Sequence, residues 1–351
     1  MRVLYIGDGN PSSTSCHRAN ALRRIGHQVD LIDPYRALSG SLRGWRGAWH
    51  YRTGYVFTRW RIIRWLRSTL RADASYDVCW VDSGELLSAE AIELIRRQCH
   101  QIVLYNHDDP TGRRDYVRFY TLRQAVSRYD LCVVVRPVNV AEFQALGAPD
   151  VMNVWRRYDE VAHHEPASDL PVPAEFQSDV AFIGFSIKGE GRDLFVRQLA
   201  QMGLNVAVWG DNWSKSKIWA DIRPYWRGPS LSGLDYVNAI RGAKVCLGLL
   251  SKGNRDEHTT RTLEIPYAGG LLCAQRTPEH RSLFEEGKEA VFWSSAEECA
   301  AICKKLMADP ALREQIRKAG QRKVIQAQLG NEDLGRAVFE RLQARSPSAK
   351  A

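Results

Sequence analysis

The sequence has no apolar run of about 18 residues, the length that a membrane-spanning helix needs. Its first residues, MRVLYIGDG, lack the charged, apolar and small-residue regions of a signal peptide. Its eight cysteines include no C-x-x-C pair, and most of them stand in apolar runs. Disulfides and structural zinc are therefore not expected, and the thiols are predicted to be reduced core residues of a cytoplasmic protein.

Acidic residues are absent between Ser41 and Arg71, which we call segment 41–71. This segment holds eight arginines and four tryptophans. Its apolar residues recur at helical spacing and predict one buried helical face formed by Val56, Trp60, Ile63, Leu66 and Leu70. A basic, aromatic helix suits an anionic membrane surface or an anionic acceptor, whereas nucleic acid is disfavoured. A solvated helix packed on its own domain explains the pattern equally well.

A complete dinucleotide-binding loop is also missing. The apolar run Val3–Ile6 predicts a buried strand, but only Gly7 and Gly9 of a G-x-G-x-x-G motif follow it. The loop before the next helix is therefore either a tight turn or a ligand contact.

The strand and turn at the N-terminus occur a second time in the chain. VLYIG at 3–7 is matched by VAFIG at 180–184, and Gly26 is matched by Gly203, both at an offset of 177 residues. Each pair encloses a predicted helix and precedes a second strand. Two echoes at one offset predict an α/β protein with two Rossmann-like domains.

Further strands are expected in the first domain at 76–81, 101–105, 131–135 and 151–155. The strand at 101–105 runs into Asn106, His107, Asp108, Asp109 and Pro110. Because ligands of α/β sheets lie at the carboxyl ends of strands, this polar cluster is predicted to face a ligand. Its two aspartates could hold a metal ion or cap a loop.

The composition becomes polar and rich in proline after residue 160, which predicts a linker at 161–177. His163 and His164 are expected to be exposed in it. The predicted organisation is an N-terminal domain at 1–160, a C-terminal domain at 178–330, and a closing helix with a frayed tail at 331–351.

Residues 244–280 combine a strand, a polar loop and a short helix. Val245–Leu250 predicts the strand, Thr259 or Thr260 a helix cap, and Gly269 with Gly270 the helix end. Backbone N–H groups at such a helix start bind anions. Asp256 and Glu264, eight residues apart, add carboxylates for ligand hydroxyls. A ligand that offers phosphate to the N–H groups and hydroxyls to the carboxylates is a nucleotide-sugar, which is therefore the ligand that this stretch indicates.

The segment Asp256–Gly270 resembles the D-x-H-T-x-R-x-x-E-I-P-x-x-G-G motif of the CgeB-like (spore maturation protein) glycosyltransferases. This group has the GT-B fold, in which two Rossmann-like domains face each other across a central cleft. The resemblance is close over 178–325 and looser over 1–150. Asp256 and Glu264 also resemble the two acids, separated by seven residues, of retaining GT-B enzymes, with Asp in place of the usual first Glu.

The resemblance implies a retaining glycosyltransferase of cell-surface glycan or glycoconjugate biosynthesis, with a nucleotide-sugar donor and a glycan, lipid-linked or protein acceptor. It implies no metal or other cofactor. The implied catalytic residues are His107, Asp108 and Asp256. The implied nucleotide-sugar-binding residues are Gly184, Arg192, Gly210, Trp226, Arg227, Lys252, His258, Thr259, Thr260, Arg261 and Glu264.

Two other functions remain open from the sequence. A nucleotide-sugar epimerase or hydrolase can use the same fold without an acceptor. A basic module that binds membrane or nucleic acid would have no catalysis. The expected location is the cytoplasm, with peripheral contact at the inner face of the membrane through segment 41–71 as one interpretation.

Overall fold

The computed structural model describes residues 1–71, 73–166 and 171–345. The chain forms two compact units. The first unit comprises Met1–Trp155, Gly253–Arg255 and the described residues from Asn331 onward. The second unit comprises Arg156–Lys252 and Asp256–Gly330.

The second unit begins before the predicted linker. Tyr158 and His163 are buried within it, so the expectation that His163 is exposed is wrong, whereas His164 is exposed as expected. His163 is buried because it faces the carboxylate of Glu264, a contact that the local sequence does not reveal. Part of the linker, 167–170, and the predicted frayed tail, 346–351, lie outside the described residues.

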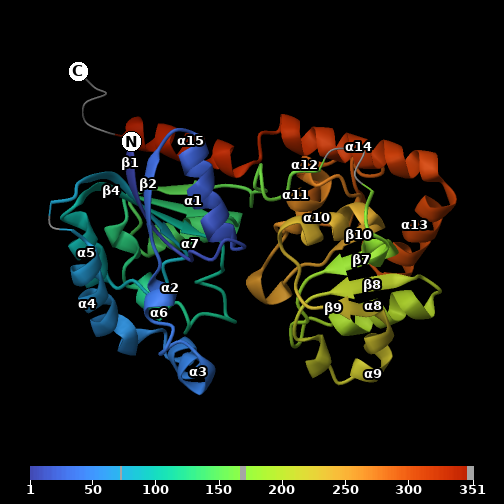
Figure 1. Cartoon of the computed structure of the whole chain (residues 1–351), viewed down its shortest axis with the longest axis horizontal. Coiled ribbons are helices and arrows are strands. Elements are labelled where there is room, and N and C mark those ends of the chain that lie inside the picture. The colour runs from blue at the N-terminus through green and yellow to red at the C-terminus, as the bar shows by residue number, and fades with distance from the viewer. Residues whose placement is uncertain (72, 167–170, 346–351) are drawn as a thin grey trace. The chain divides into compact units, whose positions relative to one another are not determined.

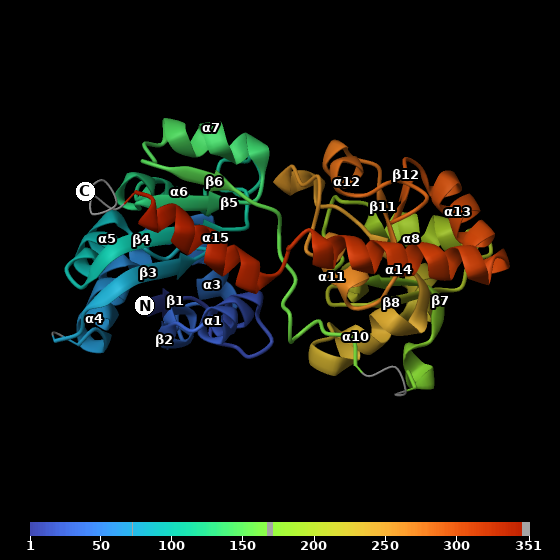
Figure 2. The same ribbon diagram turned by 90° about the horizontal axis from the view of Figure 1, so that it is seen from above.

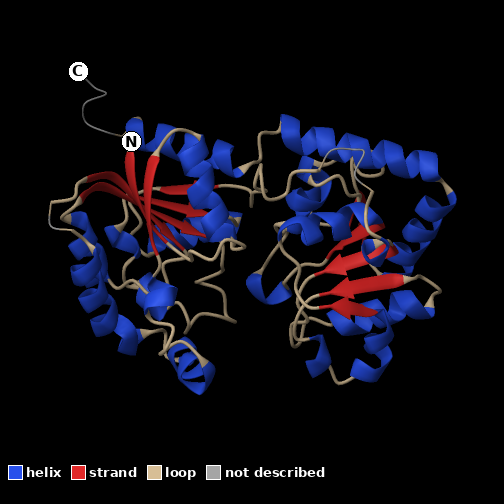
Figure 3. Cartoon of the chain, viewed as in Figure 1, coloured by secondary structure: helices blue, strands red, loops and turns tan. Residues whose placement is uncertain are grey.

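Each unit is built on a parallel sheet of six strands (Figures 1 and 3). The first has the order β2-β1-β3-β4-β5-β6, with strands β1 (Arg2–Ile6), β2 (Gln28–Ile32), β3 (Tyr76–Asp82), β4 (Cys99–Asn106), β5 (Leu131–Val134) and β6 (Val151–Asn153). The second has the order β12-β11-β10-β7-β8-β9, with strands β7 (Ser178–Ile183), β8 (Val206–Trp209), β9 (Trp226–Gly228), β10 (Ala243–Gly248), β11 (Leu272–Gln275) and β12 (Val291–Trp293). The predicted α/β class with two Rossmann-like domains is confirmed.

Helices cover both faces of the first sheet, because successive strand residues point to opposite faces. Leu4 and Ile6 pack in one core and Val3 and Tyr5 in the other. The first core is closed by α4 (Arg59–Thr69), α5 (Ala89–Arg96), α6 (Tyr120–Arg123) and α7 (Pro137–Ala145). The second is closed by α1 (Thr14–Arg24) and α15 (Asn331–Gln343), which lie side by side (Figure 2).

The second sheet is covered in the same way. On one face α8 (Arg192–Gln201) and α13 (Ala296–Ala308) bury their apolar side chains against β7, β8 and β10. On the other face α10 (Gly233–Gly242) and α11 (Arg261–Tyr267) contact β7, β10 and β11. The remaining helices of this unit are α9 (Trp219–Ile222), α12 (Pro278–Leu283) and α14 (Pro310–Gln326).

The internal repeat seen in the sequence corresponds to an equivalent strand and helix in each unit. β1 and α1 in the first unit match β7 and α8 in the second, and each first strand pairs on one side with the next strand of the chain, β1 with β2 and β7 with β8. Gly26 and Gly203 both have left-handed backbone angles, with φ of 91° and 85°. A residue with a Cβ is strained there, which explains why glycine ends the helix in both copies.

Segment 41–71 forms α3 (Gly44–Arg52), a short 3₁₀ turn (Val56–Thr58) and α4. Ile62 and Leu66 anchor α4 in the core, but Trp60 is 76% exposed. Its predicted place on the buried face is therefore wrong, because the buried stripe is centred on Ile62 and Leu66 and the ring of Trp60 points away from it. In the described part of the chain no helix is long and apolar enough to cross a membrane.

Phe339 tests the contribution of α15 to the first unit. Its ring is buried against Trp80 and His27. Phe339→Ala should lower the free energy of unfolding by about 3–5 kcal/mol, because it removes buried contacts and leaves a cavity. Denaturant unfolding measures the loss, and Glu340→Ala on the exposed side of α15 is the matched control. Equal stability of both variants would contradict the packing of α15 described here.

Candidate functional site

The strand order creates one crevice position in each sheet. β1 lies between β2 and β3, and β7 lies between β8 and β10, so the chain leaves in opposite directions from these strands. In open α/β sheets ligands bind at such switch points, outside the carboxyl ends of the strands. The loops after β1 and β7 are therefore the expected ligand-binding positions.

A polar cavity of about 230 Å³ lies at this position in the first unit. Asp82, the last residue of β3, is buried at its base. Its carboxylate accepts a hydrogen bond from the Tyr5 hydroxyl at 2.7 Å and pairs with Arg18 at 2.8 Å. Burial, followed by the charge of Asp82, raises the pKa of Tyr5 well above its ordinary value, so Tyr5 is a donor at neutral pH.

His107 lines the same cavity from the end of β4, as predicted from the sequence. Its Nδ1 lies 4.0 Å from Asp82 Oδ1, and its side chain is 36% exposed. Arg136 donates to the backbone oxygens of His107 at 3.1 Å and Asp108 at 2.7 Å and thereby fixes the loop. His107 is thus oriented at the edge of the cavity with access to it.

The two aspartates after His107 have different partners. Asp108 lines the cavity and lies 3.4 Å from Arg118, which also pairs with Glu85 at 3.2 Å. Asp109 is buried and accepts from Asn139 at 3.0 Å. Asp109 therefore acts as a structural acceptor in its loop, whereas Asp108 remains at the cavity.

The sequence did not predict Asp82, Glu85 and Arg118 in this cavity, nor Arg18 as the partner of Asp82. A signal existed for the first two, because the strand ending at Asp82 is followed by Ser-Gly-Glu, a polar cluster like the one after β4. Ser83 and Gly84 both have positive φ, and this sharp turn brings Glu85 back to the cavity. The arginines come from distant positions without a motif.

In the second unit, Arg261 and Glu264 on α11 lie at the end of β7. Arg261 Nε donates to the Ile183 backbone oxygen at 3.2 Å, and its guanidinium lies 3.7 Å from Glu264. The Glu264 carboxylate, on a residue only 2% exposed, accepts from the Tyr236 hydroxyl at 2.6 Å and lies 3.6 Å from His163 Nε2. Burial is the main cause that raises the pKa of Tyr236, which is therefore a donor. Tyr236 and His163 were not predicted here.

Asp256 and His258 form a second cluster in this unit, around Arg156. Asp256 pairs with Arg156 at 3.1 Å, and both side chains are buried. Arg156 also donates to the His258 backbone oxygen at 2.6 Å, while its own N–H donates to His258 Nε2 at 3.0 Å. The other ring nitrogen contacts Glu279 at 2.6 Å. These contacts fix the loop before α11, and the predicted role of Asp256 toward a sugar stays a prediction.

The predicted threonine cap of α11 is wrong. Thr260 stands at the cap position with helical backbone angles, and its side chain makes no capping hydrogen bond. Its hydroxyl accepts instead from Arg261 at 3.0 Å. The Thr259 N–H donates to the Thr262 hydroxyl at 3.1 Å. Both threonines thus lie just before α11, where Thr259 uses its backbone N–H and Thr260 its hydroxyl.

Arg192 and Lys252 line a common cavity of about 280 Å³ in the second unit. The Arg192 guanidinium donates to the backbone oxygens of Phe185 at 2.9 Å and Leu250 at 3.0 Å, in the loops after β7 and β10. The Lys252 N–H donates to Glu190 at 2.8 Å. Arg192 therefore links the two loops that follow β7 and β10.

Gly184 and Gly210 approach each other closely after β7 and β8. A Cβ on Gly210 would lie 2.1 Å from the Gly184 oxygen, so this position requires glycine. The Trp226 Nε1 donates to the Gly210 oxygen at 3.0 Å, which leaves part of the indole exposed at the strand ends. Arg227, the next residue, is exposed.

All eight cysteines are free, and seven of them are buried. Cys299 and Cys303 share a face of α13, and Cys273 of β11 joins them. Their sulfur atoms lie within 4.8 Å of one another, and among the described residues this trio is the one group arranged as metal ligands could be. It lies within the apolar core of the second unit.

Comparison with known protein families finds one match, which covers most of the second unit. Residues 192–332 match a family model described as "Glycosyl transferase-like". This segment includes Arg192, Lys252, Arg261 and Glu264. No curated protein matches the chain significantly.

Solved structures resemble the chain over nearly its whole length. A sucrose-phosphate synthase from Thermosynechococcus elongatus is 14% identical with a TM-score of 0.71, and 99% of this chain and 100% of that chain are covered. Anabaena Alr3699/HepE in complex with UDP-glucose is 13% identical with a TM-score of 0.66, at 98% and 100% coverage. A protein from Listeria monocytogenes titled putative UDP-N-acetylglucosamine 2-epimerase is 11% identical with a TM-score of 0.60, at 98% and 96% coverage. At these identities the likeness shows the fold, which is GT-B.

The Arg156–Asp256 pair makes a prediction for stability. Asp256→Ala leaves a buried guanidinium without its counter-charge and should cost about 3–5 kcal/mol of unfolding free energy. Arg156→Met combined with Asp256→Ala should cost less than the two single changes together, because neither charge is then left alone. Denaturant unfolding of the four proteins gives this difference. If Asp256→Ala is instead as stable as the parent protein, the ion pair contributes little to stability, and the Asp256 carboxylate of the parent protein is available for a ligand.

Proposed function

We propose that the protein transfers a sugar from a nucleotide-sugar donor to an acceptor in cell-surface glycan or glycoconjugate assembly, with retention of configuration at the sugar. The observation that carries the proposal is the pairing of Arg261 and Glu264 at the carboxyl end of β7. Both residues lie inside the segment that matches the glycosyl transferase-like model. The resemblance of this segment to the CgeB-like group supports the same assignment.

The second unit binds the donor in this proposal. Arg192, Lys252 and Arg261 are the cations for the diphosphate. Negative charge develops on the diphosphate as its bond to the sugar breaks, and cations already fixed in place stabilise that charge without rearranging. No metal ion or cofactor is needed for this step. Glu264 accepts hydrogen bonds from the ribose, and Trp226 stacks on the base.

The first unit binds the acceptor. The cavity beside His107 and Asp108 presents carboxylates, hydroxyls and an imidazole, which are groups that bind sugar hydroxyls. His107 contacts the reacting sugar, and Asp82 and Arg136 orient it. Asp256 acts from the second unit by fixing, with Arg156, the loop that leads to the cations.

Calorimetric titration with UDP, GDP and dTDP tests the donor half directly. One of these nucleotides should bind in the absence of divalent metal. Absence of binding by all three would overturn the proposal.

Glu264 distinguishes ligand binding from a structural role. Charge-assisted hydrogen bonds to the ribose contribute roughly 1.5–3 kcal/mol each, so Glu264→Ala should weaken nucleotide binding by about one to two powers of ten. Glu264→Gln should lose less, because its amide oxygen still accepts. Tyr236→Phe removes the protein donor to the same carboxylate and is the matched control, with affinity nearly unchanged. If Glu264→Ala lowers the melting temperature and keeps nucleotide affinity, the carboxylate is structural.

His107 should affect catalysis without affecting donor affinity. His107→Ala should lower turnover, with the nucleotide dissociation constant nearly unchanged, because His107 belongs to the other unit. His100→Ala, at the opposite end of the same strand and exposed, is the control. A large loss of nucleotide binding in His107→Ala would show that the residue is misassigned.

The likeness to the Listeria protein titled as an epimerase favours one alternative function on the same fold. An epimerase or hydrolase would convert the nucleotide-sugar without any acceptor. A scan of UDP-, GDP- and dTDP-sugars for products formed by the protein alone tests this. Epimerised donor, or hydrolysis as fast as transfer, would favour the alternative.

A further inference from the structure

Segment 41–71 exposes large aromatic side chains that a protein surface normally buries. Trp45 and Trp60 are each 76% exposed, and Phe57 and Trp49 are 58% and 44% exposed. Around them stand six exposed arginines. We call these residues together the aromatic–arginine surface: Trp45, Trp49, Phe57, Trp60, Arg43, Arg46, Arg52, Arg61, Arg64 and Arg67.

Several of these residues adjoin one another. The ring of Trp49 on α3 stacks on that of Phe57 at 4.5 Å and so joins α3 to the 3₁₀ turn. Trp60 follows Phe57 by three residues, and Arg64 and Arg67 follow at one-turn spacing along α4. The side of α4 facing the protein is occupied by Ile62 and Leu66. The exposed rings are thus not needed to hold the helix in place.

The positive charge of this surface is not neutralised within the protein. Segment 41–71 contains no acidic residue. Throughout 1–71, 73–166 and 171–345, none of the six arginines forms an ion pair with a carboxylate, and Arg61 bonds to the Ser41 hydroxyl instead. By contrast, Arg71 at the end of the segment pairs with Asp73. The surface therefore presents uncompensated guanidinium groups beside exposed indoles.

We infer that the aromatic–arginine surface docks the protein on an anionic lipid bilayer. Indole rings favour the boundary between water and hydrocarbon, where their apolar body and N–H group are both accommodated. Guanidinium groups bind lipid phosphates, and each basic residue near an anionic leaflet adds to the attraction. Apart from the stacking of Trp49 on Phe57, neither feature is required by the core, so the bilayer explains both together.

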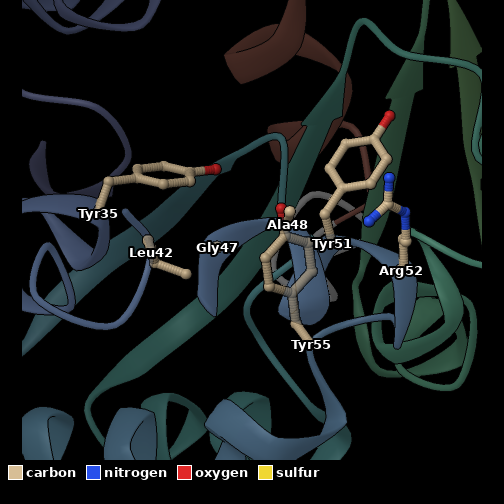
Figure 4. Close-up of a pocket in the computed structure, with 7 residues that line it drawn as sticks. All are labelled: Tyr35, Leu42, Gly47, Ala48, Tyr51, Arg52 and Tyr55. Carbon is tan, nitrogen blue, oxygen red and sulfur yellow. The ribbon is translucent and has the colours of Figure 1, made fainter. Parts of the chain in front are cut away.

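A cavity that shares Arg52 with this surface indicates what the docking is for (Figure 4). It has a volume of about 460 Å³ and is lined by Tyr35, Leu42, Gly47, Ala48, Tyr51, Arg52 and Tyr55, most of which belong to segment 41–71. Burial raises the pKa of Tyr55 to about 12, so it is a hydrogen-bond donor at neutral pH.

Tyr35 connects this cavity to the site described above, because it also lines the polar cavity beside His107. A molecule anchored in the bilayer would therefore meet the Arg52 guanidinium and then the polar cavity. This consequence, a lipid-linked acceptor, rests on the proposed function, whereas docking on the bilayer does not.

Sedimentation with vesicles tests the inference. The full chain should bind vesicles made of phosphatidylglycerol and phosphatidylcholine in equal parts. It should bind vesicles of pure phosphatidylcholine much more weakly. Replacing Arg46, Arg64 and Arg67 with serine should weaken binding by about 100-fold and make its dependence on salt shallower. Trp45→Ser with Trp60→Ser should weaken binding while leaving the salt dependence unchanged.

A matched control removes the same charge elsewhere. Arg223→Ser, Arg281→Ser and Arg322→Ser, at exposed positions of the second unit, should bind vesicles like the parent protein. An equal loss in this control would reduce the effect to net charge and overturn the inference. Failure of the parent protein to bind the anionic vesicles, or tighter binding to a short RNA or DNA, would also overturn it.

Nucleotide titration of the same variants separates this inference from the proposed function. Variants that bind nucleotide normally but no longer bind vesicles support docking as a separate property. If the parent protein binds nucleotide and transfers sugar without any affinity for vesicles, docking is wrong and the proposed function stands. If it binds vesicles but none of the nucleotides, docking on the bilayer stands and the proposed function is wrong.

Discussion

A buried carboxylate organises the carboxyl end of each sheet: Asp82 in the first unit and Glu264 in the second. Each accepts a hydrogen bond from a buried tyrosine hydroxyl, of Tyr5 or Tyr236, and has an arginine beside it. An unpaired buried charge would be very costly, so these contacts must all be present at once. That requirement fixes the strand ends on which His107 and the cations of the second unit depend.

The fold was largely predictable because buried parallel strands appear as short apolar runs and because the repeat at an offset of 177 residues is visible in the sequence. The strands expected at 76–81 and 131–135 are found at Tyr76–Asp82 and Leu131–Val134. The prediction of which face of α4 is buried was wrong for a physical reason. Tryptophan was counted as a core residue, but core packing on α5 selected Ile62 and Leu66, and the indole of Trp60 was left outside.

The candidate site was predictable only in part. His107 follows from the rule that ligands meet the carboxyl ends of strands. The partners of the site residues do not follow from any local pattern, because they come from far along the chain. Arg18 reaches Asp82 across 64 residues, and Arg156 reaches Asp256 across 100. Only the folded chain distinguishes a carboxylate that is held by an arginine from one that faces a ligand.

Segment 41–71 differs from these clusters in how its charged side chains are paired. At the strand ends each arginine has a carboxylate or a carbonyl oxygen as its partner, and the chain keeps its charges in fixed positions. In segment 41–71 the six arginines repel one another, and the adjacent indoles are exposed to water. Both effects oppose folding, yet Ile62 and Leu66 would hold α4 without them. A surface that costs stability and is not required by the core is best explained by a partner that neutralises the guanidinium groups and covers the rings.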